Sequence, residues 1–169
     1  MENPSRVRWI TATESVIDAV GRLTLWLTLA MIALVAVNVI LRYSLSVGSV
    51  WAQEMEWHLL ALLILLGLCY ALQRGENVRV DVFYARFSPS TKRWVDSVSI
   101  ILLLIVAVLF VRLSIPYVLQ SYSINEISSD PGGLPFRWLI KSAIPLGFGL
   151  VALQCCAALA RLWMGKRDV

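Results

Sequence analysis

Four long runs without charged residues constrain this chain more than any other feature. Each run is 15 to 19 residues long, and they cover residues 23–41, 57–73, 97–111 and 142–160. The third run is the shortest, but it continues beyond Arg112 with no further charge until Glu126. Since a helix rises about 1.5 Å per residue, runs of this length cross the roughly 30 Å hydrocarbon layer of a bilayer. The sequence therefore predicts an all-α integral membrane protein with four transmembrane helices.

The composition excludes several other classes of protein. Apolar residues make up 59% of the 169 residues and charged residues 15%, whereas soluble domains are about 45–50% apolar and about 25% charged. A disordered or fibrous chain is excluded on these grounds. The net charge of +4 comes from charges scattered in the gaps between apolar runs, so no continuous basic face is expected and nucleic acid is not a predicted partner.

The distribution of Lys and Arg predicts the orientation of the helices. We place the spans in one membrane domain, residues 1–169, at about 22–43, 52–73, 94–119 and 138–162. The termini and the connection after the second span carry 11 Lys and Arg residues, against 4 on the opposite side. Both termini are therefore predicted to be cytoplasmic. The first span is expected to be retained and not cleaved as a signal peptide, since it starts late and is longer than an h-region. Arg112 is expected near the far interface, where its side chain would reach the headgroups.

The connection between the second and third spans has an amphipathic pattern. Apolar residues recur at helical spacing over residues 78–88, while Arg79 and Arg86 fall between them. This spacing predicts a short helix lying on the inner membrane surface, with an amphipathic strand as the alternative. Ser88 followed by Pro89 has the residue types of an N-cap and a first helical position, so the third span should begin there.

Few residues carry chemistry. His58 is the single histidine, and a haem between helices usually needs two axial ligands, so we interpret it as structural or interfacial. Cys155 and Cys156 are adjacent, unlike the spaced cysteines of disulfide-exchanging membrane enzymes. Small residues recur every fourth position in this helix, and we predict that this stripe packs against a neighbouring helix. The stripe consists of Ala152, Cys156 and Ala160.

Polar residues at the rims of the spans are predicted to join helices. The amides of Asn38, Gln73 and Gln154 are expected to form interhelical hydrogen bonds. Arg42 ends the first span and Glu54 begins the second, so we predict an ion pair between them that fixes the hairpin, in preference to a substrate-binding role. No carboxylate occurs inside the four uncharged runs, where a cation-coupled carrier would need one.

Short polar, aromatic, glycine and proline motifs occur in order along the chain. They are Asn38, Arg42-Tyr43, Trp51, Glu54, Gly67, Arg74-Gly75, Val78-Arg79-Val80-Asp81, Leu134-Pro135, Trp138 and Pro145-Leu146-Gly147. In this order and spacing they resemble the small membrane subunit, of the DctQ type, of tripartite ATP-independent periplasmic (TRAP) transporters. The resemblance covers about residues 15–160, and Asn77 stands where the family usually has a histidine. Among the motif residues, the structural or partner-interface candidates are Asn38, Arg42, Tyr43, Trp51, Glu54, Gly75, Arg79 and Asp81.

The resemblance implies a noncatalytic subunit of the bacterial inner membrane, with no cofactor. Its expected partners are a large polytopic TRAP membrane subunit, a periplasmic substrate-binding protein and membrane lipids. The transporters of this family typically take up organic anions with sodium, and the small subunit would scaffold the large carrier subunit. Two other functions are left open by the residues: a small membrane redox subunit that binds haem or quinone, and an independent small carrier.

Overall fold

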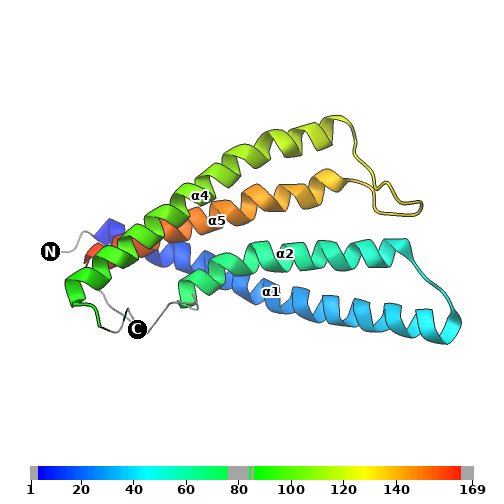
Figure 1. Cartoon of the computed structure of the whole chain (residues 1–169), viewed down its shortest axis with the longest axis horizontal. Coiled ribbons are helices and arrows are strands. Elements are labelled where there is room, and N and C mark those ends of the chain that lie inside the picture. The colour runs from blue at the N-terminus through cyan, green and yellow to red at the C-terminus, as the bar shows by residue number, and fades with distance from the viewer. Residues whose placement is uncertain (1–3, 76–83, 85, 165–169) are drawn as a thin grey trace.

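The predicted all-helical architecture is confirmed. The computed structural model describes residues 4–75, 84 and 86–164. Its long helices, shown in Figure 1, are α1 (Pro4–Leu45), α2 (Val50–Arg74), α4 (Pro89–Ser123) and α5 (Arg137–Met164). All four are long and apolar enough to cross a membrane, and each contains one predicted span. Helix α1 begins 18 residues before its predicted span, because the helix also includes the charged segment that precedes the uncharged run.

Local sequence signals set three of the helix ends. Ser49 caps α2 by accepting a hydrogen bond from the Ala52 N–H at 3.3 Å, and α2 ends at Gly75, whose φ of 74° is easily adopted only without a side chain. The predicted start of the third span is confirmed, because the Ser88 hydroxyl accepts from the Thr91 N–H at 3.2 Å and Pro89 follows it. The predicted amphipathic segment lies largely outside the described residues, as do Arg79 and Asp81.

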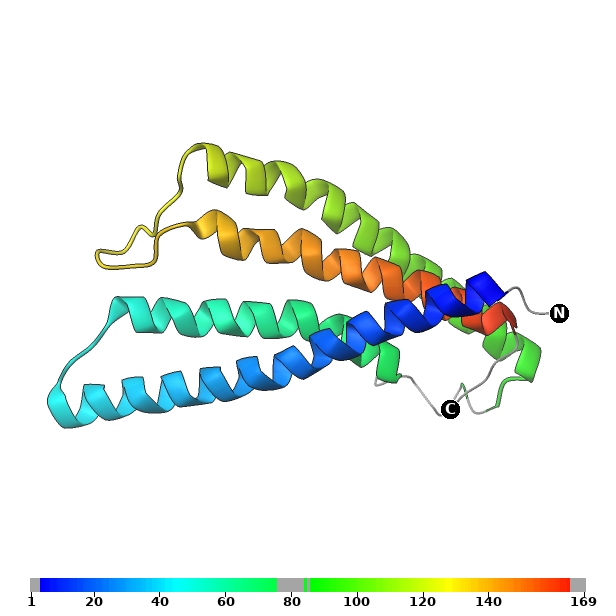
Figure 2. The ribbon, with the colours of Figure 1, turned by 180° about the vertical axis from the view of Figure 1, so that it is seen from behind.

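The helices form two antiparallel hairpins that lie side by side. Helix α1 packs on α2, α2 packs on α5, and α5 packs on α4, while α1 also reaches α5. We call the end where α1 begins and α5 ends the terminal end, and the opposite end, with the connections 46–49 and 124–136, the loop end. The helices spread apart from the terminal end toward the loop end (Figures 1 and 2). Helix α5 is therefore central, and α1 and α4 form the two edges.

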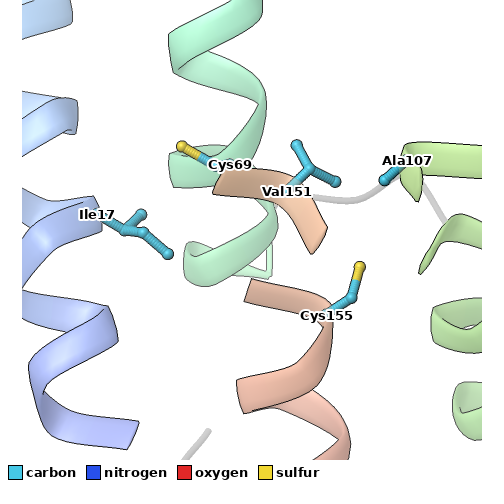
Figure 3. Close-up of a cluster of buried hydrophobic side chains, with 5 residues drawn as sticks. All are labelled: Ile17, Cys69, Ala107, Val151 and Cys155. Carbon is cyan, nitrogen blue, oxygen red and sulfur yellow. The ribbon is translucent and has the colours of Figure 1, made fainter. Parts of the chain in front are cut away.

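The core lies between the hairpins and consists mainly of small side chains. Figure 3 shows Val151 and Cys155 of α5 between the other three helices. The cluster is completed by Ile17 of α1, Cys69 of α2 and Ala107 of α4, and all five side chains are fully buried. Most large apolar side chains instead point outward, as expected where lipid covers the surface.

Glycines allow two of the helix pairs to approach closely. A Cβ on Gly21 of α1 would lie 2.3 Å from the Tyr70 ring of α2. A Cβ on Gly147 of α5 would lie 2.8 Å from the backbone oxygen of Leu65. Since real Cβ contacts are not this short, both positions require glycine for the observed packing.

Candidate functional site

Glu54 joins the two hairpins at the loop end. Its carboxylate is buried, with 5% of the residue exposed, and faces the connection between α4 and α5. One oxygen accepts a hydrogen bond from the Ser128 hydroxyl, and the other accepts from the Leu134 N–H at 2.6 Å. Gly133 permits this approach, since a Cβ there would lie 2.8 Å from Glu54 Oε2. The carboxylate thus fixes the 124–136 connection to the first turns of α2.

The predicted ion pair between Arg42 and Glu54 is wrong. Within the described chain no such pair is found, and Arg42 is exposed while Glu54 contacts the α4–α5 connection. The carboxylate that faces α1 is Glu56, whose Oε1 accepts from Asn38 Nδ2 at 2.8 Å. Two residues rotate a helix by about 200°, so Glu54 and Glu56 point to different neighbours. The sequence predicted the hairpin contact but assigned it to the wrong residues.

A second set of contacts stabilises the connection 124–136. Lys141 of α5 donates a hydrogen bond to the Glu126 carboxylate, and this hydrogen bond is the main reason that the pKa of Glu126 lies below its usual value of 4.5. The Lys141 ammonium also lies 4.0 Å from the centre of the Tyr117 ring, a cation–π contact. The backbone of the loop pairs across itself, with the Ser128 N–H donating to the Leu134 oxygen at 3.2 Å. The connection 124–136 is therefore an ordered loop held by its own hydrogen bonds and by contacts with α4 and α5.

The terminal end has its own polar contacts, which the sequence did not reveal. Glu14 of α1 forms an ion pair with Arg161 of α5, and Asp18 of α1 pairs with Arg74 of α2 at 3.1 Å. Gln73 Nε2 also donates to the Glu14 backbone oxygen at 3.4 Å. Glu14 and Asp18 are four residues apart and therefore share one face of α1. This spacing was the sequence signal from which a polar contact with other helices could have been predicted. These contacts join three helices.

Two of the three predicted interhelical amide contacts are found. Asn38 bonds to Glu56 and Gln73 to the backbone of α1, both between helices. The Gln154 side chain is buried, and within the described residues its Oε1 has no hydrogen-bond partner. His58 does not face another helix through its Nδ1, which lies 2.6 Å from the backbone oxygen of Glu54 in its own helix.

The predicted small-residue stripe is displaced by one residue. Cys156 is exposed, and Ala152 and Ala160 are only half-buried. The buried stripe instead has the same four-residue spacing and consists of Ala143, Gly147, Val151 and Cys155. One residue rotates the helix by about 100°, which is enough to turn a packed position outward. Ala160 lines an apolar cleft of about 360 Å³ at the terminal end, together with Trp9 and Trp163.

The remaining candidates lie at the surface. Tyr43 is 83% exposed and Trp51 is 47% exposed, both near the loop end. Gly75 is exposed and serves as the helix cap of α2. Tyr43 and Trp51 lie near the loop end and Gly75 lies at the opposite end of α2, so these residues do not make up a single binding site.

Comparison with known proteins agrees with this architecture. The family model described as "Tripartite ATP-independent periplasmic transporters, DctQ component" matches residues 31–165. No curated protein matches the chain. The matched range begins within α1 and includes α2, α4 and the whole of α5, together with the Glu54 contacts at the loop end. The chain therefore belongs to the DctQ family, the small membrane subunits of tripartite ATP-independent periplasmic transporters.

Proposed function

We propose that this subunit is a noncatalytic scaffold for the large carrier subunit of a sodium-coupled transporter that takes up organic anions. The observation that carries the proposal is the placement of the acidic side chains. Within the described chain every acidic residue lies outside the four uncharged runs: Glu14 and Asp18 precede the run of α1, Glu54 and Glu56 begin α2, Asp96 precedes the run of α4, and Glu126 and Asp130 lie in the α4–α5 connection. A cation-coupled carrier needs such a group at membrane depth, so coupling and substrate binding are assigned to the large subunit.

The shape of the subunit is consistent with a scaffold role. Its two hairpins lie side by side, and both edge helices expose large apolar side chains. A moving carrier domain needs a stationary neighbour in the bilayer, and a broad apolar layer offers a large contact surface to one. Sodium coupling and the organic-anion substrate are proposed from what transporters of this family typically do, since the description of the matched family states only the tripartite, ATP-independent and periplasmic character.

Reconstitution into liposomes tests the assignment. Three preparations are compared: this chain alone, the large subunit alone, and both together. Each receives the soluble binding protein, an inward sodium gradient and a candidate organic anion. We expect uptake only with both membrane subunits. Saturable uptake by this chain alone contradicts the noncatalytic role, and full uptake by the large subunit alone contradicts the scaffold requirement.

We also propose that both termini are cytoplasmic and that the connection 124–136 faces the periplasm of a bacterial inner membrane. The excess of Lys and Arg at the terminal end supports this orientation. Single cysteines at positions 90 and 129, in a background without the three native cysteines, make it testable. A membrane-impermeant thiol reagent should label position 129 in intact spheroplasts and position 90 only after lysis. The reverse pattern means the opposite orientation.

A further inference from the structure

Arg112 is a cation on the outward face of α4, the helix at one edge of the subunit. The side of α4 that faces α5 contains the buried residues Ala107 and Ser114. Arg112 is rotated by about 140° from Ala107, so it projects away from α5. Its residue is exposed, and among the described residues no hydrogen bond or ion pair of its guanidinium is found. Its neighbours on this face, Ile105 and Leu109, are more than half exposed.

Two aromatic pairs give the depth of Arg112. Trp94 and Trp163 contact each other at the terminal end, and Tyr122 and Trp138 do so at the loop end. Aromatic residues of this kind favour the headgroup level. The pairs are about 42 Å apart along α4, close to the 40–45 Å of a bilayer with its headgroups. Arg112 lies about 15 Å along α4 from the loop-end pair, which is more than the thickness of one headgroup layer, so it lies inside the hydrocarbon layer.

The direction of the side chain makes contact of Arg112 with the headgroups unfavourable. In a helix the Cα–Cβ bond tilts toward the N-terminus. Helix α4 begins at the terminal end, so the Arg112 stem is directed away from the nearer headgroups. A guanidinium held in hydrocarbon without a partner is unfavourable, because the charge loses its hydration there. A lipid phosphate at the interface is therefore a poor partner for this residue.

Pro116 adds a polar acceptor at the same place. It lies within α4, four residues after Arg112, and is exposed on the same face. Proline has no N–H, so the Arg112 carbonyl cannot receive its usual helical hydrogen bond from position 116. A strong donor and a backbone acceptor thus occur together on an apolar surface. Helices that associate in membranes use such polar groups as contact points.

The geometry points to the face of α4 around Arg112 as the docking surface for a transmembrane helix of the large subunit. That helix would carry a carboxylate, or another strong acceptor, at the depth of Arg112. This inference rests on the proposed scaffold function and specifies which edge of the subunit performs it. The α1 edge is equally apolar over Leu25, Leu29 and Ile32, but no charge of this depth marks it.

Co-purification of the two membrane subunits in mild detergent tests the docking surface. The variants are Arg112→Leu, Arg112→Lys and Arg112→Glu, with Arg93→Leu as the matched control. Arg93 is an exposed arginine on the same helix, one residue from Trp94 at the interface. We expect Arg112→Leu and Arg112→Glu to lower recovery of the complex by roughly tenfold, the scale of a polar interhelical contact. Arg112→Lys should retain more complex than Arg112→Leu, and Arg93→Leu should match the wild type.

Thermal unfolding of each isolated variant separates docking from folding. The midpoint of Arg112→Leu should equal that of the wild type or exceed it, because Arg112 has no partner within the described chain. A large fall in the midpoint overturns the inference in favour of a contact inside the subunit. If the Arg112→Leu variant recovers as much of the complex as the wild type, the inference is also overturned. This holds too if native mass spectrometry shows that the variant has lost only a bound anionic lipid and not the large subunit.

Photocrosslinking locates the surface independently. A benzoylphenylalanine at position 109 on α4 should give an adduct with the large subunit, whereas one at position 29 on α1 should not. Adducts from position 29 alone place docking on the other edge, which contradicts this inference and leaves the scaffold function intact. If the wild-type subunits do not co-purify and give no adduct from either edge, the scaffold function itself fails.

Discussion

The terminal half and the loop half of this subunit are joined by different kinds of contact. In the terminal half, all four helices contribute to one core of small buried side chains, and ion pairs from α1 reach both α2 and α5. In the loop half the helices spread apart (Figure 2), and the hairpins are bridged by the Glu54 carboxylate and a folded connection. Close packing through small residues thus holds one half, and directed hydrogen bonds hold the other.

The largest expected effect comes from Gly147, at the boundary between the halves. Replacing Gly147 by Leu places side-chain atoms against the backbone of Leu65, which cannot move aside without separating α2 from α5. We expect a loss of stability near the upper end of about 1–3 kcal/mol, measured by thermal unfolding in detergent. Gly149→Leu is the matched control, since a Cβ there meets nothing within 4 Å. Equal losses in both variants contradict the close approach.

Within the terminal half, the two adjacent cysteines should respond differently to added bulk. Cys155 is fully buried in the core, whereas Cys156 is exposed. Cys155→Leu should destabilise the isolated subunit by about 1–2 kcal/mol through overpacking, and Cys156→Leu should change its stability little. The same unfolding assay measures both. A greater loss of stability in Cys156→Leu than in Cys155→Leu supports the packed stripe that was predicted from the sequence.

In the loop half, Glu54→Gln should loosen the connection between the hairpins. The variant keeps the size of the side chain but replaces one of the two acceptor oxygens and removes the charge. Amide hydrogen exchange over residues 128–134 should become faster by roughly tenfold, because hydrogen bonds to a charged group are the stronger ones.

The control for this experiment is Glu56→Gln, two residues along the same helix. Glu56 bonds to Asn38 within the first hairpin and does not contact the described connection. Exchange in residues 128–134 should therefore stay at the wild-type rate in this variant. Faster exchange in both variants means that the substitutions loosen α2 as a whole and do not act through the hydrogen bonds of Glu54.

The smallest expected effect is the pH dependence of the Glu126 contact. The lowered pKa of Glu126 means that its ionised form is stabilised in the folded protein relative to the unfolded one. This contribution is complete above the usual pKa of 4.5 and is lost as the pH falls through the lowered pKa. Lys141→Met should return the folded-state pKa toward 4.5, so that the contribution becomes smaller and its loss is complete at a higher pH. Carbon-13 NMR titration of the Glu126 carboxyl measures this, and an unchanged pKa in Lys141→Met excludes Lys141 as its cause.

The sequence by itself determined the four helices. The runs around Leu29, Leu65, Ile105 and Val151 lack charges over a membrane-spanning length, and a backbone in hydrocarbon must satisfy its own hydrogen bonds, which a helix does. Ser88-Pro89 and Gly75 likewise set helix ends by local chemistry, because a cap depends on only a few neighbouring residues.

Only the tertiary structure decided which side of each helix is packed. A soluble helix shows its buried face as an apolar stripe, but these helices are apolar on all sides because lipid and protein are equally apolar neighbours. A shift of one residue therefore distinguishes the predicted stripe with Cys156 from the buried stripe with Cys155. A shift of two residues distinguishes Glu56, which contacts α1, from Glu54, which contacts the α4–α5 connection. The same reason explains why the Glu14 and Arg161 pair went unrecognised: its members are 147 residues apart and meet only when α1 packs against α5.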